Sequence, residues 1–306
     1  ETATFGKATL RGSAKNPSLY VAHILQQDGK LVDGFVAKGR DSEGQAVAVS
    51  PDGKDVYVMG QCHEDVLFDN LTIQNRGGKS FCVAHANQNL LFQNVYTGVG
   101  GVTGQSMMLL PGKGLFVAGS FLGTVGLGPD DKDENRQVTY DAPDEGNDAN
   151  GDLITGNGLF VARLRERTLE YSWGKQGVTA FAYKGDQDVV GMHVNKDGVI
   201  FLAGRFRGGN FRYHTEKQIK PKGEWDSFVV RLAPDGSFYK GPVYTVAGKQ
   251  DDQLTAMAID GQGSLYMGGF VLGATVFATS LGKPQPKWVG VSDAFVWKVP
   301  YNRLGF

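Results

Sequence analysis

Two short apolar phrases recur along the chain, and each is bounded by turn signals. The first runs aliphatic, aromatic, apolar, small, glycine, and it occurs at residues 56–60, 115–119, 200–204 and 265–269. Each copy follows a glycine-containing turn signal, and another apolar stretch, such as residues 256–259, precedes that turn. An apolar strand, a turn with glycine and a second apolar strand predict a β-hairpin. We call this the leading hairpin of each repeat.

The second phrase follows the first and closes on a basic or potentially basic residue. It occurs at residues 19–23, 81–85, 160–163, 228–231 and 295–298. Most copies then turn, as at Asp28-Gly29 or Pro234-Asp235-Gly236, into a further apolar stretch. This pattern predicts a second hairpin, which a linker segment containing phenylalanine joins to the leading one.

The order hairpin, linker, hairpin repeats with a period of roughly 60 to 70 residues, which is typical of four-stranded propeller blades. A β-sandwich would explain evenly spaced strands, but not the same phrases recurring in the same order. The prediction is an all-β protein, a β-propeller of five blades with four antiparallel strands each, forming one domain over residues 1–306. The expected blade units are 1–40 (partial), 41–100, 101–185, 186–248 and 249–306, with an acidic insertion at 128–158.

The composition agrees with this architecture. Glycine contributes 44 of 306 residues, about twice its usual share of roughly 7%. Among these, Gly60, Gly119, Gly204 and Gly269 end the four leading phrases. We interpret them as strand residues at a tight packing position or a bulge, because no nucleotide-binding loop surrounds them.

The arrangement resembles the bacterial beta-propeller repeat (SBBP-type) family. There a VYVAG-like strand precedes an Asp/Ala-Phe-Val-Ala-Lys-Leu strand and an Asp-Gly turn, and residues 226–232 and 292–298 of this chain come closest to the second pattern. The resemblance covers nearly the whole chain but rests on short apolar phrases. It implies an extracellular or cell-surface module without catalysis.

The repeats are unequal at the N-terminal end, where the first unit lacks a leading hairpin. Three explanations remain open. Residues before Glu1 have been removed, a degenerate strand has escaped notice, or another chain fills the gap, since an unpaired sheet edge is a template for strand addition. The chain begins at Glu1 rather than Met, which we interpret as a sign of processing or trimming.

Charge and cysteine content narrow the classes of function. The net charge of −1, with acids and bases interspersed, predicts no nucleic-acid partner. No run of 18 apolar residues occurs, so we expect no transmembrane segment. The two cysteines, Cys62 and Cys82, are compatible with one disulfide, but spacing alone does not decide whether they are bonded.

One basic side chain per blade closes the second phrase. If the blades are equivalent, these residues form a ring that binds an anionic ligand on the axis. The alternative is that each makes a local ion pair or extends to solvent. The candidate ring consists of His23, His85, Arg163, Arg231 and Lys298.

The acidic insertion offers a candidate calcium site. Asp144, Asp148, Asn150 and Asp152 place oxygen ligands at the close spacing that calcium prefers. Leu153 stands where an EF-hand loop has glycine, and no glutamate occupies the twelfth position, so an acidic loop without metal is the alternative. Calcium is the only cofactor that the sequence suggests.

Acidic patches precede the first strand of three units, at residues 40–43, 186–188 and 251–253. They either rim one face of the propeller, with an acid/base pair for a glycosidase or lyase, or form the turns that enter the strands. The chain has no G-x-S-x-G elbow, P-loop or H-E-x-x-H motif.

The sequence therefore predicts a secreted or cell-surface module without catalytic activity. Its expected partners are a surface protein, a glycan, or identical or other subunits of a structural assembly. The alternative function is a carbohydrate-active enzyme, a glycoside hydrolase or lyase, that uses acidic residues near the propeller channel.

Overall fold

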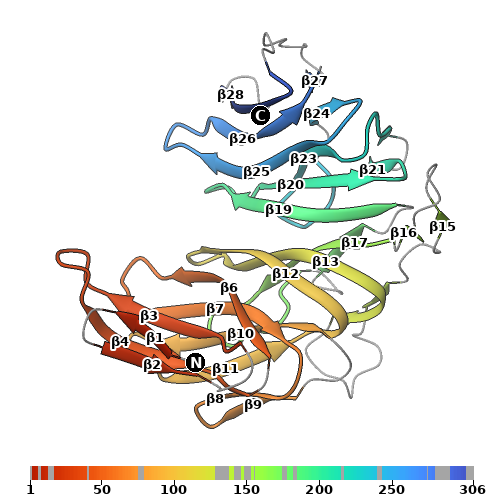
Figure 1. The fold of residues 1–306 in the computed structure, drawn as a ribbon. Helices are drawn as coiled ribbons and strands as arrows, with labels where there is room; N and C mark the ends of the chain where they lie inside the picture. Colours follow the sequence, from red (N-terminus) through yellow and green to blue (C-terminus); the bar gives the residue numbers. More distant parts are fainter. Residues whose placement is uncertain are drawn as a thin grey trace. The chain divides into compact units, whose positions relative to one another are not determined.

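The protein is built from antiparallel β-sheets (Figure 1), as the sequence predicts. The computed structural model describes residues 2–5, 8–12, 17–39, 41–74, 79–127, 138–140, 146–147, 153–154, 156–173, 178–181, 185–214, 217–239, 243–273, 275–279 and 290–300. No helix occurs in these ranges, and hence no helix capable of crossing a bilayer. Among the same residues no sheet closes into a ring.

Four sheets repeat one plan, in which consecutive strands lie side by side. The first has the order β11-β10-β7-β6, and it comprises β6 (Ser42–Val49), β7 (Asp55–Cys62), β10 (Ser80–Asn87) and β11 (Phe92–Thr97). The second has the order β12-β13-β17-β18, with β14 paired to β13. Its strands are β12 (Val99–Leu110), β13 (Gly114–Leu127), β14 (Val138–Tyr140), β17 (Gly158–Leu164) and β18 (Val178–Phe181).

The third and fourth sheets continue the plan toward the C-terminus. The third is β19-β20-β23-β24-β27, made of β19 (Asp186–Val194), β20 (Ile200–Arg207), β23 (Asp226–Leu232), β24 (Tyr244–Gly248) and β27 (Thr275–Thr279). The fourth has three described strands, β25 (Asp252–Ile259), β26 (Leu265–Leu272) and β28 (Ser292–Val299).

Smaller elements complete the fold. At the N-terminal end β3 (Tyr20–Ile24) pairs with β4 (Leu31–Val36), and both lie in the expected partial unit. The remaining short strands are β1 (Thr2–Phe5), β2 (Ala8–Arg11), β5 (Lys38–Gly39), β8 (Val66–Phe68), β9 (Leu71–Ile73), β15 (Gly146–Asn147), β16 (Leu153–Ile154), β21 (Phe211–His214) and β22 (Lys217–Ile219).

The leading hairpins turn where the sequence has its polar-glycine signals. Gly53 and Gly198 adopt φ values of 72° and 90°, a left-handed region that side chains with a Cβ rarely occupy. Asn195 Oδ1 accepts hydrogen bonds from the amides of Asp197 (3.0 Å) and Val199 (2.9 Å). The side chain thus takes up backbone donors that the turn would leave unpaired.

Three of the four recurring glycines face a β-bulge, one of the two placements expected for them. The register shifts opposite Gly60, Gly204 and Gly269, in β6, β19 and β25 respectively. At each of these glycines a Cβ atom would collide with a carbonyl oxygen of the bulged strand. Glycine therefore ends these three phrases because the neighbouring backbone comes too close for a side chain.

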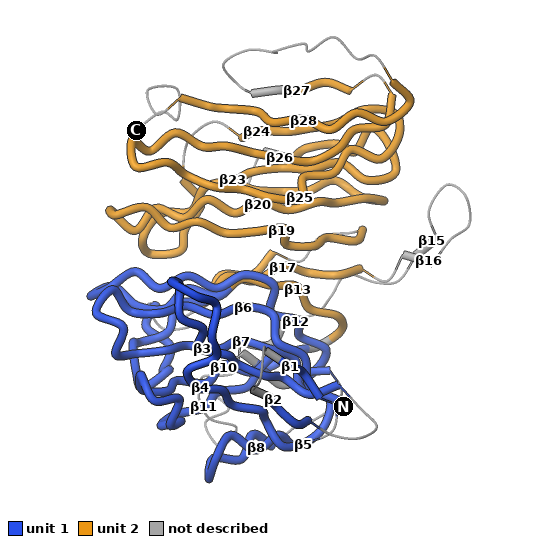
Figure 2. Tube along the Cα trace, turned by 60° about the vertical axis from the view of Figure 1, so that its left-hand side comes forward, with its two compact units in different colours: residues 1–117, 124–139, 162–177 blue, residues 118–123, 140–161, 178–306 orange. Residues whose placement is uncertain are grey.

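The chain divides into two compact units (Figure 2). Unit 1 comprises residues 1–117, 124–139 and 162–177, and unit 2 comprises residues 118–123, 140–161 and 178–306, so the second sheet has residues in both. Each unit has its own core. In unit 1, Phe35 of β4 packs on Phe68 and Phe92, with ring centroids 5.7 and 4.5 Å apart.

The core of unit 2 lies between two sheets stacked face to face. Phe201 and Val229, from the third sheet, pack in one cluster with Leu265, Met267 and Val299 from the fourth. One face of the fourth sheet is therefore buried against the sheet that precedes it in the chain.

Candidate functional site

Most of the predicted basic or potentially basic residues lie next to aromatic rings. Four of the five make such a contact: His85 with Tyr57, Arg163 with Phe116, Arg231 with Tyr239 and Lys298 with Tyr266. Tyr57 and Tyr266 are the direct cross-strand partners of His85 and Lys298. His23 is exposed on β3. These residues thus have local aromatic partners, through a ring stack at His85 and cation–π contacts at Arg163, Arg231 and Lys298. A ring around a common axis stays a prediction.

His85 is the buried member of a partly exposed polar cluster in unit 1. Its Nε2 lies 2.8 Å from Asp55 Oδ1, and its side chain has no exposed surface. The Arg167 guanidinium donates to both oxygens of Asp55, at 3.1 and 2.9 Å. Hydrogen bonding from Arg167 lowers the pKa of Asp55, so this carboxylate is ionised and ties two segments together.

Arg231 and Lys298 differ in their access to solvent. Arg231 is almost fully buried, and burial lowers the pKa of its guanidinium. Lys298 is about half exposed, and its Nζ lies 3.8 Å from Asp260 Oδ2. Because only Lys298 is accessible to a solute, Arg231 and Lys298 are not equivalent as binding groups.

The candidate calcium ligands Asp144, Asp148, Asn150 and Asp152 lie outside the described residues. Within the part of the chain that the structure describes, no group of three histidine, cysteine or acidic side chains could hold a metal ion. The proposed calcium site therefore rests on the sequence.

The acidic patches place a buried polar residue at the start of a strand. Ser42, Asp186 and Asp252 begin β6, β19 and β25, and each is at most 3% exposed. Asp186 Oδ1 accepts a hydrogen bond from the Gly156 amide at 3.1 Å, and Asp252 Oδ1 accepts one from the Thr275 hydroxyl at 2.5 Å. These contacts fix the starts of β19 and β25, as the turn interpretation expects.

In unit 2, two arginines, one tryptophan and two aspartates form a partly exposed cluster that we call the ladder. It is the most elaborate polar arrangement among the described side chains. The guanidinium carbons of Arg205 and Arg207 lie 4.6 and 4.8 Å from the ring centre of Trp225. Asp188 pairs with Arg205 at 3.0 Å and Asp186 with Arg207 at 2.8 Å. Both arginines keep about a third or more of their side chains exposed, 34% and 41%.

The ladder also joins two sheets, because Arg205 Nη1 donates to Gln253 Oε1 of β25 at 2.7 Å. Sequence reasoning missed it. The available signal was an Arg-x-Arg pair directly after Gly204, which alternation places on one face of a strand, together with acids two residues apart in Asp186 and Asp188. An indole with two guanidiniums can present a flat, hydrogen-bonding surface to a glycan or peptide.

Two carboxyls beside the ladder have raised pKa values. Burial raises the pKa of Asp226 to about 6, although the amides of Lys222 and Gly223 oppose the shift and Asp252 adds to it. Burial also raises the pKa of Asp252. Neither residue has exposed surface, and Asp226 Oδ2 accepts a hydrogen bond from the Lys222 amide at 2.5 Å. A substrate would not reach either carboxyl in this conformation.

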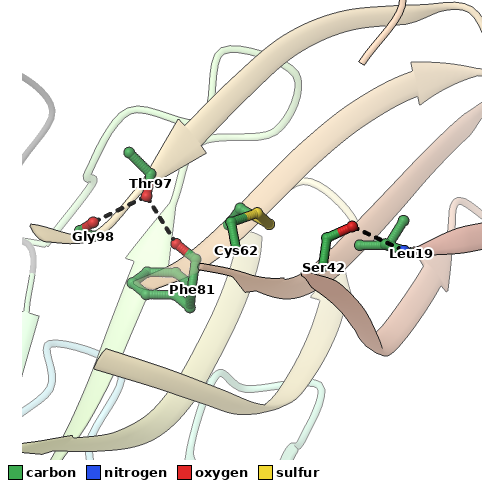
Figure 3. Close-up of a disulfide and its surroundings, with 7 residues drawn as sticks. Leu19, Ser42, Cys62, Phe81, Thr97 and Gly98 are labelled. Carbon is green, nitrogen blue, oxygen red and sulfur yellow. Dashed lines mark hydrogen bonds between the residues drawn. A yellow bond between two sulfur atoms is a disulfide. The ribbon is translucent and has the colours of Figure 1, made fainter. Parts of the chain in front are cut away.

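Cys62 and Cys82 form a disulfide between the adjacent strands β7 and β10 (Figure 3). Their Cα atoms are 6.3 Å apart, and both residues are buried. Near the bridge Ser42 Oγ accepts a hydrogen bond from the Leu19 amide, and Thr97 Oγ1 donates to the Phe81 carbonyl. The structure therefore contains the disulfide that the sequence left undecided.

A scan of protein-family models and a search of curated proteins find no match to this chain.

Proposed function

We propose that this chain is an extracellular β-propeller module that binds a macromolecular partner and performs no catalysis. The partner is a surface protein, a glycan, or another subunit of a surface assembly. The proposal includes membership of the SBBP-type repeat family and an arrangement of the sheets as five propeller blades.

Repetition supports the propeller. Three leading hairpins share a bulge opposite a glycine, at Gly60, Gly204 and Gly269. In unit 2 the third sheet covers the fourth face to face. Sheets with this plan and this stacking are the units from which propellers are built.

The observation that carries the binding role is the exposure of large apolar side chains on regular strands. Val47 and Val49 of β6 are 59% and 53% exposed, and Val296 of β28 is 79% exposed. Repeat proteins normally end in a polar capping face, because an apolar one costs solubility. Apolar groups that stay exposed on such faces are typical of interaction surfaces.

The disulfide supports an extracellular location. Disulfides persist in oxidising compartments and are rare in reducing ones. The bridge between Cys62 and Cys82 is buried in the core of unit 1, where it is protected from exchange with small thiols.

A carbohydrate-active enzyme is the alternative, and the observation in its favour is the raised pKa of Asp226, about 6. A general acid needs such a value, but it also needs contact with the substrate. We expect Asp226 to act in folding instead, as a buried acceptor for the amides that precede β23.

A paired screen separates the two functions. The wild-type chain and the variants Asp226→Asn and Asp252→Asn are each applied to a glycan array and to a panel of glycosides and uronides. The proposal predicts no turnover by any of the three proteins. Turnover by the wild type that both variants lose would establish the enzyme and refute the binding module.

A further inference from the structure

The two arginines of the ladder bind their aspartates through one edge of the guanidinium. Asp188 and Asp186 of β19 are the direct cross-strand partners of Arg205 and Arg207 of β20. Nε and Nη2 of Arg205 donate to Asp188 Oδ2 at 3.2 and 3.0 Å. In Arg207, Nε and Nη2 both lie 2.8 Å from Asp186 Oδ2. Because a guanidinium is planar, each arginine keeps its Nη1 group on the side away from its aspartate.

Donors and an acceptor remain available on this surface. Arg205 Nη1 donates one hydrogen to Gln253 Oε1 at 2.7 Å, and its other hydrogen has no partner among the described residues. In the same part of the chain Arg207 Nη1 makes no hydrogen bond. Asp188 accepts from Arg205 through Oδ2, so within the described residues its Oδ1 keeps its lone pairs. Arg205, Arg207 and Asp188 have side chains 34%, 41% and 20% exposed, so a solute can reach all three.

The charges of the ladder cancel, because two arginines stand against two aspartates. The flanking charges are mixed as well. Lys222 and Glu224 are exposed beside Trp225, and Asp251 is partly exposed. An acidic ligand would meet these carboxylates as well as the arginines, and like charges placed together disfavour binding. The ladder therefore suits an uncharged ligand better than a uronate, a phosphate or an acidic peptide.

Trp225 adds an apolar surface whose position is fixed. Its amide donates to Asp251 Oδ1 at 3.2 Å, and its carbonyl accepts from the Asp252 amide at 2.8 Å. The two guanidinium carbons lie 4.6 and 4.8 Å from its ring centre, and the residue is partly exposed. An aromatic ring with a few fixed polar groups is typical of small-ligand sites. Groups that are ordered before binding lose little entropy when the ligand arrives.

We propose that the ladder binds an uncharged glycan. Each sugar hydroxyl both donates and accepts a hydrogen bond. The hydroxyls accept from Nη1 of Arg205 and Arg207 and donate to Asp188 Oδ1, and Trp225 packs against carbon-bound hydrogens of the sugar ring. The inference deepens the proposed binding function, on which it rests, because it selects a glycan among the partner classes and assigns its site.

The first experiment applies the whole protein to an array of neutral oligosaccharides, pentagalacturonate, heparin oligosaccharides and a hexaglutamate peptide. Calorimetry then measures the affinity for the neutral oligosaccharide that binds best. We expect saturable binding with a Kd of about 1 mM or lower, and no binding of the acidic probes. An array without a neutral hit, or with acidic hits alone, would overturn the inference.

Conservative variants test the site itself. Arg207→Lys keeps the charge beside Asp186 but removes the planar fork, so affinity for the neutral oligosaccharide should fall roughly tenfold. Trp225→Ala should weaken it by a similar factor, because the apolar contact is lost. Arg212→Lys is the matched control, since Arg212 is an exposed arginine of β21 outside the ladder and its replacement should leave affinity unchanged. Thermal unfolding verifies that the variants fold, and wild-type affinity in the two ladder variants would refute the site.

Asp188→Asn tests the charge balance. The substitution removes an accepting carboxylate and leaves the ladder with a net positive charge. Affinity for the neutral oligosaccharide should fall roughly tenfold, and pentagalacturonate should now bind. An ion pair that only stabilised the fold would not change the preference between the two classes. An unchanged preference for the neutral oligosaccharide would contradict the proposal.

Failure of this inference is distinguishable from failure of the proposed function. If no neutral oligosaccharide binds but native assemblies form and respond to Val296→Lys on β28, the glycan site is wrong and the binding module stands. If the wild type cleaves the oligosaccharide that it binds, and Arg207→Lys weakens that binding, the site stands and the absence of catalysis is refuted.

Discussion

Strands β23 and β28 carry the same phrase but differ in burial. All seven residues of β23 are buried, whereas alternate residues of β28 are exposed, including Val296 at 79%. In the core of unit 2 both strands contribute to one cluster, through Val229 on one side and Phe295 and Trp297 on the other. A repeated sequence therefore fixes the strand, and the neighbouring sheets decide how many of its faces are buried.

The difference in burial between β23 and β28 is tested most directly by removing an apolar side chain from each strand. Phe228→Ala should destabilise the protein by about 3–5 kcal/mol, because it leaves a cavity where the ring packs on Gly204. Val296→Ala should change the free energy of unfolding by no more than about 0.5 kcal/mol. Urea titration measures both, and equal losses would contradict the assigned burial.

The sheets also differ in what lies opposite the recurring glycine. Cys82 and its disulfide stand opposite Gly60, where the third sheet has Phe228 opposite Gly204. The double variant Cys62→Ala, Cys82→Ala should lose about 3 kcal/mol, the value for a closed loop of this length. The wild type under reducing denaturant should show the same loss, and the variant should show no further effect of reductant.

Acidic groups of the two units should respond to pH in opposite directions. The folded pKa of Asp226, about 6, exceeds its unfolded value of 3.8. The stabilising contribution of this group to the free energy of unfolding is therefore lost as pH rises between these values. The pKa of Asp55 is lowered, so its contribution is lost as pH falls through the folded value.

Asp226→Asn tests the first of these directions. The free energy of unfolding of the wild type should fall by roughly 2–3 kcal/mol between about pH 4 and pH 6, and the variant should not show this fall. The variant should be at least as stable as the wild type at pH 7. Asp55→Asn is the control and should lower stability at pH 7. Unfolding free energies measured across pH would contradict the account if Asp226→Asn kept the wild-type slope.

Much of this organisation was predictable from local patterns. The phrases located the strands, and Gly204 was expected at a tight packing position or a bulge, because a glycine inside a strand has few other uses. The ladder on Trp225 was not predictable, since it joins residues from β19, β20, β25 and the segment before β23. The burial of Asp226 likewise depends on the Lys222 and Gly248 segments, whose approach no short pattern encodes.

The smallest expected effect concerns the acidic insertion. If Asp144, Asp148, Asn150 and Asp152 bind calcium, the ion should raise the free energy of unfolding by RT ln(1 + [L]/Kd), about 1–3 kcal/mol at saturating concentrations, and the melting temperature should rise with it. The variant in which the three aspartates are replaced by asparagine and Asn150 by alanine should lose this response. Identical melting curves with calcium and with chelator would rule out the site.

Light scattering on the protein purified from its native source tests the central claim, that the exposed apolar strands bind a partner. The account predicts a mass above that of one chain, falling to one chain when Val47, Val49 and Val296 are replaced by lysine. A mass of one chain for the wild-type protein, with calcium and with chelator, would contradict it.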